Sequence, residues 1–499
     1  MPQELPPSTT DAPSPRWRSV VVSLATLLAL TLPVAACAPL PARERLEPRA
    51  VAAAAPASAA AQVTVRDHRG TLAPADEASA LDRVKAEGRG ALLEHHLRVL
   101  AATGEVDLYR NNATRLLIDG PATFQAMKAA VAQARQRVLL ESYIIEDSRM
   151  AEEMAALLRA KVQQGVQVAV LYDAVGSLHT DSGYFDALAK NGIAVCKFNP
   201  INPLERPGYW GINHRNHRKV LVVDNEVALT GGINISRVYT SGSTGSGSGG
   251  SARSGGSVPS RGNAGADPVD EGWRDTNIEL RGPVVPAIAA GFVRVWQSQG
   301  CKGALGTSPP PRQATPGQRV VKLLESDPQE PGNRIYSVLL AAIDASRRSV
   351  HLSMAYFAPG EDMVQALCDA ARRGVEVSLL LPGRSDFTLV LHAGRSYYER
   401  LLSAGVTIHE MDNAVMHAKT AIIDGVFSTV GSSNMDWRSF VANNEINVIV
   451  LGDDFGTELE RLFVRDLKAS RLIEPAAWRQ RDVRDRMLEV IGRLAERFL

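Results

Sequence analysis

The chain contains 499 residues, and its 55 lysines and arginines nearly balance its 54 aspartates and glutamates, giving a net charge of +1. A chain of this length suits two or three domains, and its balanced charge argues against dedicated nucleic-acid binding, which usually requires a basic surface. The sequence contains no glycine-rich nucleotide loop, zinc-ligand spacing or calcium loop, so we expect neither a metal ion nor another cofactor.

The N-terminus has the layout of a secretory signal, with two arginines, an apolar run and small residues before a cysteine. Val34-Ala35-Ala36-Cys37 resembles a bacterial lipobox, so we expect residues 1–37 to be a signal peptide and the mature chain to begin at a lipidated Cys37. An uncleaved N-terminal membrane anchor is the alternative. Either arrangement predicts a membrane-associated protein of the bacterial cell envelope, with the Ala/Pro-rich stretch 38–75 as a tether.

A histidine-rich strand carries the first chemical motif. In HRNHRKVLVVDNEVALTGGINIS, residues 214–236, the run Val220–Val223 is apolar and bounded by a turn signal, which predicts a buried strand. Side chains two apart share one face of a strand, so His217 and Lys219 should point the same way. Asp224 lies at an odd offset from His217, so it should face elsewhere and brace the fold.

The same pattern occurs again in the second half of the chain. MHAKTAIIDGVFSTVGSSNMDWRS, residues 416–439, repeats the spacing around another apolar strand. The matched pairs are His217 and His417, Lys219 and Lys419, Asp224 and Asp424, and Asn234 and Asn434. Upstream segments match too, each half running helix, strand, helix, strand and motif strand, which indicates an internal duplication. We expect an N-terminal domain over 76–310, with a Ser/Gly-rich insertion at 241–265, and a C-terminal domain over 311–475.

The doubled His-x-Lys-x4-Asp pattern with its trailing asparagine resembles the signature of the phospholipase D superfamily. The segments LLPGRSDFTLVLHAGRSYYERLLSAGVTIHE and VGSSNMDWRSFVANNEINVIV are similar to the bacterial cardiolipin synthase branch of that superfamily. The resemblance implies an α/β fold of two fused domains with mixed sheets, related by a pseudo-two-fold axis. It also implies that the two domains share one active site at their interface.

These residue types suit phosphodiester chemistry. Negative charge increases in the five-coordinate transition state, and we expect Lys219, Lys419 and the substrate-binding amides of Asn234 and Asn434 to stabilise it. One imidazole can attack phosphorus to form a phosphohistidine, while the other exchanges protons with the leaving and incoming hydroxyls. The resemblance implies that His217 is the nucleophile and that the second motif histidine is the acid/base.

A nucleophilic histidine needs a partner for its other ring nitrogen. The resemblance implies an acidic residue downstream of each motif, which is Glu445 after the second and Asp275 after the first, with Glu279 as the alternative to Asp275. The expected catalytic set is therefore His217, Lys219, Asp224, His417, Lys419, Asp424, Asp275 and Glu445. Within this set, the two motif aspartates should act by bracing the fold.

Residues outside the motifs have simpler interpretations. His214 has no lysine two residues later, which places it at the surface or beside the phosphate. Tyr143 and Tyr356 follow matching strands, and each would either line the pocket or fill the core. The cysteines beyond the tether are scattered and odd in number, so we expect no disulfide framework among Cys196, Cys301 and Cys368.

The last segment, 476–499, has the periodicity of an amphipathic helix. One helical face carries Val483, Met487, Val490, Ile491, Leu494 and Phe498, and arginines lie elsewhere. We expect this apolar face to pack on the core. Binding to an anionic bilayer surface is the alternative.

These features predict a membrane-tethered phosphatidyltransferase of the cardiolipin synthase type, acting on phospholipids such as phosphatidylglycerol. A hydrolytic phospholipase D with the same site is the first alternative. A phosphodiesterase nuclease is disfavoured by the balanced charge and the tether, and we expect no nucleic-acid partner. A catalytically inactive lipid-binding lipoprotein is disfavoured because both motifs are intact.

Overall fold

The computed structural model describes residues 63–86, 88–202, 204–205, 211, 213–243, 272–305, 315–330 and 332–498. Cys37, most of the expected tether and most of the Ser/Gly insertion lie outside the described residues. The end of the stretch assigned to the tether, 38–75, is nevertheless regular structure. Strands β1 (Thr64–Asp67) and β2 (Gly70–Thr71) pair there, and helix α3 (Pro74–Lys85) begins before residue 76.

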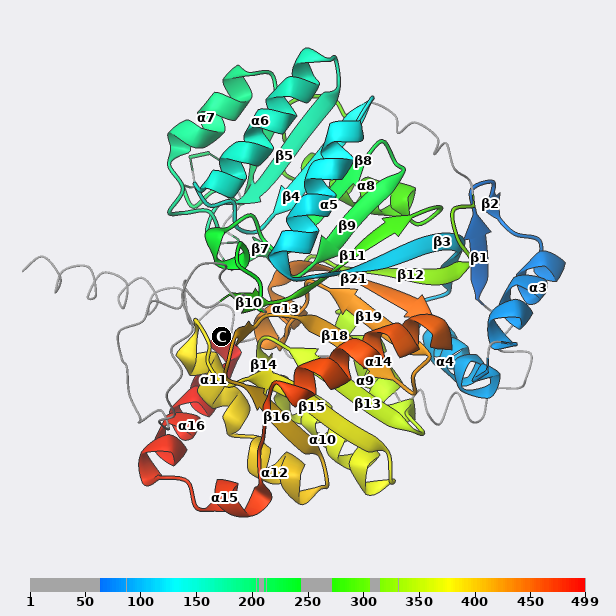
Figure 1. Cartoon of the computed structure of the whole chain (residues 1–499), viewed down its shortest axis with the longest axis vertical. Helices are drawn as coiled ribbons and strands as arrows, with labels where there is room; N and C mark the ends of the chain where they lie inside the picture. The colour runs from blue at the N-terminus through cyan, green and yellow to red at the C-terminus, as the bar shows by residue number, and fades with distance from the viewer. Residues whose placement is uncertain are drawn as a thin grey trace, which may run out of the picture.

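Both halves of the described chain contain a mixed sheet with the same strand order (Figure 1). In the first half the order is β6 (Ala194–Phe198), β5 (Gln167–Asp173), β4 (Arg137–Ser142), β8 (Val220–Val223), β9 (Val227–Gly231), β11 (Thr276–Arg281) and β3 (Asp107–Ile118). In the second half it is β16 (Thr407–Met411), β15 (Glu376–Pro382), β13 (Ser349–Met354), β18 (Lys419–Ile423), β19 (Phe427–Gly431), β21 (Asn443–Leu451) and β12 (Arg319–Ser326). Strands β3 and β12 pair antiparallel and join the halves. This repeated order confirms the predicted pair of fused α/β domains.

Helices cover both faces of each sheet, so the central strands are buried on both sides and consist of continuous apolar runs. One face of each half carries α5 (Asp119–Gln133), α6 (Arg149–Gln163) and α7 (Ser182–Lys190), or α9 (Arg334–Ala345), α10 (Gly360–Arg372) and α12 (Tyr398–Ser403). The other faces carry α8 (Val285–Ser298) and α14 (Asp453–Lys468), and one apolar cluster there extends through both halves. Helix α4 (Gly90–Ala102) packs against α9.

Two short parallel pairings cross between the halves. Strand β7 (Arg215–Asn216) pairs with the start of β21, and β10 (Trp273–Arg274) pairs with β17 (Val415–Met416). Each pairing places the residues just before one motif histidine beside the residues just before an acidic residue of the other half. The crossing strands therefore bring the two motifs to one place.

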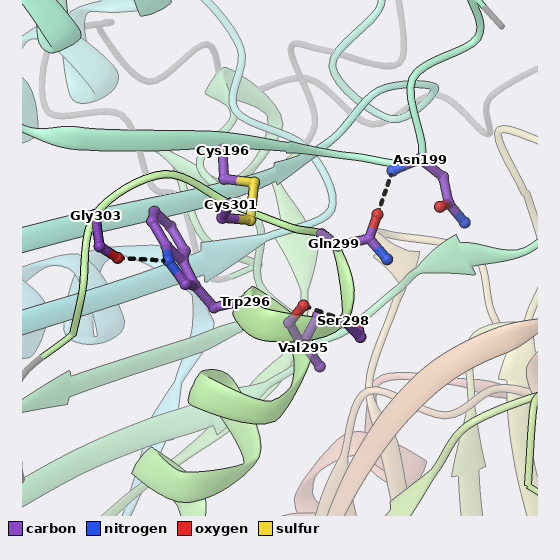
Figure 2. The surroundings of a disulfide bond; sticks show 8 residues. All are labelled: Cys196, Asn199, Val295, Trp296, Ser298, Gln299, Cys301 and Gly303. Carbon is purple, nitrogen blue, oxygen red and sulfur yellow. Dashed lines mark hydrogen bonds between the residues drawn. A yellow bond between two sulfur atoms is a disulfide. The ribbon is translucent and has the colours of Figure 1, made fainter. Parts of the chain in front are cut away.

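A disulfide joins Cys196 of β6 to Cys301, which follows α8, with the two Cα atoms 5.6 Å apart (Figure 2). The expectation that these two cysteines stay unpaired is wrong, and Cys368 is the free cysteine of the described part of the chain. The bond ties the edge strand β6 to the turn after α8, where Gln299 also accepts the backbone N–H of Asn199 at 3.0 Å. The partners are 105 residues apart, so only the fold reveals their pairing.

The C-terminal segment forms α15 (Pro475–Arg479) and α16 (Val483–Ala495). The apolar face of α16 does not pack on the core as expected, since Leu494 on that face is 76% exposed. The opposite side packs instead, because Gly492 is buried against the backbone of α11 (Thr388–Arg395). Among the described helices, none is both long and apolar enough to cross a membrane.

Candidate active site

A pocket of about 520 Å³ lies where the two halves meet. Its lining includes His217 and Asn234 from the first half and His417 and Asn434 from the second. Much of the remaining lining is apolar or aromatic: Tyr143, Ile144, Val238, Tyr239, Trp273, Tyr356, Phe387 and Val390. The fold therefore collects the motif histidines and asparagines, which are far apart in the sequence, into one largely apolar cavity.

His217 is held by a carboxylate from the other half. Its Nδ1 lies 3.0 Å from Oε1 of Glu445, and its backbone N–H donates to the carbonyl of Asn444 at 3.0 Å. Because an ionised carboxylate only accepts hydrogen bonds, Nδ1 carries the proton and Nε2 keeps its lone pair. Burial lowers the pKa of His217 to about 4, although Glu445 opposes that shift. The ring is therefore neutral at pH 7, as a nucleophile requires.

His417 has the mirrored arrangement. Its Nδ1 lies 2.7 Å from Oδ2 of Asp275, and its backbone N–H donates to the carbonyl of Arg274 at 2.7 Å. The hydroxyl of Tyr239 lies 3.1 Å from the same Nδ1. Burial, reinforced by the charge of Lys419, lowers the pKa of His417 well below its ordinary value. Each histidine is thus oriented by the acidic residue of the opposite half.

The two acidic residues have different surroundings. Ser432 donates its hydroxyl to Oε2 of Glu445 at 2.5 Å, whereas the matching position beside Asp275 is Gly232. A Cβ at Gly232 would lie 2.3 Å from a carboxylate oxygen of Asp275, so that position excludes a serine.

Their protonation differs as well. Burial raises the pKa of Glu445, but His217 and other neighbours outweigh it and the net pKa is lowered. Burial dominates at Asp275 and raises its pKa to about 6. Glu279, the alternative to Asp275, pairs instead with Arg281 at 3.0 Å and does not line the pocket.

The two motif lysines lie beneath the histidines. Lys219 and Lys419 each donate to the backbone carbonyl of their own motif histidine at 2.5 Å, and both side chains are buried. Burial lowers the pKa of Lys219 to about 7 and that of Lys419 to about 8. Neither ammonium group is among the described side chains that line the pocket, but Nζ of Lys419 lies 3.0 Å from Nδ1 of His417, a residue that does line it.

The motif asparagines lie at the pocket wall. Oδ1 of Asn234 accepts the backbone N–H of Ile144 at 3.1 Å, which directs its amide nitrogen toward Tyr239. Asn434 is fixed through its backbone N–H, which donates to Ser439 at 3.1 Å. The side-chain amide of Asn234, held in this way, can donate to a phosphodiester without reorganising.

The motif aspartates lie outside the pocket and tie strands together. Asp224 accepts the backbone N–H groups of residues 135, 136 and 137 at 2.7–2.8 Å, at the start of β4. Asp424 does the same for residues 347–349 at the start of β13, and His96 of α4 bonds it at 2.9 Å. Both aspartates have a positive φ, 52° and 55°, at the turn after the motif strand. Both aspartates therefore join the end of the motif strand to the start of a neighbouring strand, away from the pocket.

The structure shows where the three candidate residues outside the motifs lie. His214 is buried, contrary to the surface interpretation, and its Nε2 lies 2.7 Å from Oδ1 of Asn444. Tyr143 and Tyr356 line the pocket rather than filling the core, and the ring centroid of Tyr143 lies 5.1 Å from that of His217. The pocket face of these tyrosines supplies apolar surface beside the histidines.

Sequence reasoning missed Tyr239 and Trp273, which contact His417. The Trp273 ring centroid lies 5.0 Å from that of His417, and Tyr239 bonds its Nδ1. The position that matches Tyr239 in the second copy is Ser439, so comparing the copies gives no signal for an aromatic residue there. The neighbouring pair Asp436 and Arg438 also lines the pocket, where the first copy has a serine and a valine.

The fold and the site together define a phospholipase D-like protein with two histidine motifs. The family described as "Cardiolipin synthase, PLD-like domain" matches residues 127–244 and 339–467. Cardiolipin synthase of Geobacillus kaustophilus is 31% identical over 400 residues, covering 80% of this chain and 74% of that protein. Cardiolipin synthase 2 of Bacillus anthracis is 30% identical, covering 80% of this chain and 73% of that protein. The chain belongs to the cardiolipin synthase family and is an enzyme of the phosphatidyltransferase type.

A solved structure supports the fold. The crystal structure of phosphatidylserine synthase from Haemophilus influenzae matches with a TM-score of 0.54 and 12% sequence identity, covering 77% of this chain and 92% of that chain. At this identity the likeness concerns the fold alone.

Proposed function

We propose that the enzyme transfers a phosphatidyl group from one phosphatidylglycerol molecule to another, forming cardiolipin and releasing glycerol. The observation that carries this proposal is the pair of histidines at one pocket, each held through Nδ1 by a carboxylate of the other half. This geometry leaves both Nε2 atoms available for chemistry at one phosphorus atom.

In the first step, Nε2 of His217 attacks the phosphorus of the donor lipid and the bond to the glycerol oxygen breaks. His417 gives a proton to that oxygen, and glycerol leaves. The pKa of His417 is lowered in the free enzyme, but a bound phosphodiester adds negative charge beside it and favours its protonated form. Protonation of His417 is therefore coupled to substrate binding.

In the second step, neutral His417 takes the proton from a hydroxyl of the acceptor phosphatidylglycerol. The acceptor oxygen attacks phosphorus, and the bond between phosphorus and His217 breaks. Lys219, Lys419 and the two asparagine amides stabilise the charge of both transition states, and one such preorganised donor typically contributes about 3–4 kcal/mol.

The apolar lining favours transfer over hydrolysis. Water competes with the acceptor at roughly 55 M, but well-oriented reactants reach effective molarities of about 10⁵ M or more. Aromatic and aliphatic walls exclude water and accept the glycerol backbone of a lipid. Incubation of the purified enzyme with phosphatidylglycerol vesicles tests this proposal. Cardiolipin should exceed phosphatidic acid among the products, and dominant phosphatidic acid would instead identify a hydrolase.

We propose further that the enzyme is a lipoprotein anchored at Cys37, with its catalytic body outside the cytoplasm. The disulfide between Cys196 and Cys301 supports this location, since such bonds persist in oxidising compartments such as the periplasm. Mass spectrometry of the mature protein should find an acylated N-terminal Cys37. An intact segment from Met1 to Ala36 would replace the lipoprotein with an N-terminal membrane anchor.

A further inference from the structure

We infer that the exposed apolar face of α16 is a docking surface for an anionic phospholipid bilayer. Five apolar side chains of this helix are each more than half exposed: Val483, Met487, Val490, Ile491 and Leu494. At about 100° of rotation per residue, they form one continuous stripe. Single exposed apolar residues are ordinary on protein surfaces, but a continuous stripe marks an interaction site.

The charges around the stripe match an anionic surface. Arg484 borders one edge of the stripe and Arg486 borders the other, and both are exposed. The acidic residues of the helix lie on the opposite side, where Glu489 is buried and paired with Arg481 at 2.7 Å. Because cations adjoin the apolar face and acids are turned away from it, a negatively charged lipid surface is the favoured occupant.

Helix α16 packs against α11, which forms part of the wall of the catalytic pocket. Gly492 lies against the backbone of α11, where a Cβ would come within 2.4 Å of the nitrogen of Ala393, and Ala495 packs on the apolar cluster of α11. Figure 1 shows α16 beside α11. Beyond its C-terminal end, Glu496 accepts the hydroxyl of Tyr397 at 2.6 Å. The stripe therefore has a fixed position relative to α11.

Helix α11 connects this surface to the site of the chemistry. Val390 of α11 lines the pocket, and Phe387 just before α11 lines it as well and is 41% exposed. A bilayer in contact with α16 would lie one helix away from the pocket. The surface would hold the pocket at a fixed distance from the bilayer, because α16 is packed on α11.

Contact with lipid can be measured without any turnover. The full-length Ile491→Cys variant is labelled with a fluorophore at position 491 and mixed with vesicles of phosphatidylcholine and phosphatidylglycerol. The vesicles contain nitroxide-labelled lipids, which quench the fluorophore where it contacts the bilayer. Val464→Cys on α14 is the matched control, because Val464 is also an exposed apolar residue on a helix. The parent chain is the labelling blank. We expect quenching at position 491, stronger with more phosphatidylglycerol and weaker at high salt, and none at position 464.

A second measurement separates docking from chemistry, since the interpretation of α16 as a substrate-presenting surface rests on the proposed function. Met487→Gln, Ile491→Gln and Leu494→Gln together should lower turnover of vesicle lipid by on the order of tenfold. Turnover of a short-chain, water-soluble phosphatidylglycerol should be unchanged, and Val464→Gln should alter neither rate. If the parent enzyme does not convert the short-chain lipid at all, the proposed function fails while the quenching result still stands.

Three outcomes would overturn the inference. Equal quenching at positions 491 and 464 would show that α16 contacts the bilayer no more than another exposed helix does. A label at position 491 that is shielded without lipid and becomes exposed on dilution would show that a second copy of the chain covers the stripe. Loss of both vesicle and short-chain turnover in the triple glutamine variant would mean that α16 supports the pocket itself.

Discussion

The imidazole of His217 and the carboxylate of Glu445 belong to different halves of the chain, yet they lie 3.0 Å apart. In the same way, Nδ1 of His417 in the second half lies 2.7 Å from the carboxylate of Asp275 in the first half. Neither half therefore holds a complete histidine–carboxylate pair, and packing of the halves against each other completes both pairs. A protein made of one such half would therefore have to associate with a second copy of itself to form an active site.

Replacing the orienting carboxylate should cost catalysis rather than folding. In Glu445→Gln the amide can no longer fix the Nδ1 proton of His217, and we expect kcat to fall on the order of 10³-fold or more, as in other histidine–carboxylate sites. Thermal unfolding monitored by circular dichroism measures stability in parallel. Glu410→Gln is the matched control, because Glu410 is equally buried but bonds Arg395 rather than a motif histidine. An active Glu445→Gln enzyme would contradict the orienting role.

The two motif histidines should be separable by trapping. His217→Ala and His417→Ala should each abolish turnover almost completely, because water replaces neither step at that position. With a phosphatidyl substrate that has a good leaving group, His417→Ala should accumulate a phosphatidyl group on His217, detectable by peptide mass spectrometry. His214→Ala should keep most activity, since His214 contacts Asn444 and does not line the pocket. If the trapped group is found only on His417, in the His217→Ala variant, the two roles are reversed.

The duplicated pattern predicted much of this site because strand geometry is local. Alternation along a strand predicts that Asp224 faces away from His217, and Asp224 lies outside the pocket, where it bonds the start of β4. The exchange of acidic residues was not predictable, since spacing along the chain does not tell whether Glu445 serves its own half or the other. Tyr239 had no signal because its counterpart is a serine.

Long-range pairing and helix orientation were not predictable from the sequence either. The periodicity of α16 predicts a helix with an apolar stripe, but whether that stripe faces inward depends on what α11 offers, which is a close backbone approach at Gly492. The disulfide likewise depends on α8 ending beside β6. Both features arise from tertiary packing and leave no local pattern in the sequence.

The disulfide should stabilise the first half and should be visible by thiol titration. A disulfide typically contributes about 2–4 kcal/mol, so the double variant Cys196→Ser/Cys301→Ser should unfold at lower denaturant concentration. Under denaturing, non-reducing conditions, the described part of the mature chain should show one thiol, that of Cys368. Two additional thiols should appear after reduction. Three thiols before reduction, in protein taken from the cell envelope, would contradict the disulfide.

The pH profile should be displaced toward acid at both ends. The pKa of His217 is lowered to about 4, so its nucleophilic lone pair persists to a lower pH than that of an ordinary imidazole. The acid limb of kcat/KM should therefore lie well below pH 6.5. The pKa of Lys219 is lowered to about 7 and that of Lys419 to about 8. As the pH rises through this range, the ammonium groups lose the charge that attracts the phosphodiester. His417, whose lowered pKa leaves it neutral in the free enzyme, must also gain a proton to act as the acid, so both effects should make kcat/KM fall as the pH rises.

A comparison of kcat with kcat/KM tests the cause of the basic limb. The bound phosphodiester stabilises the charged lysines and raises the pKa of each, so the basic limb of kcat should lie at higher pH than that of kcat/KM. In Lys219→Arg the guanidinium stays charged at any pH of the assay, so the basic limb should move upward in whatever activity remains. Stopped-flow or discontinuous product assays between pH 4 and 10, roughly the range set by these groups, give both parameters. A basic limb that stays in place in both comparisons would assign it to a group other than Lys219.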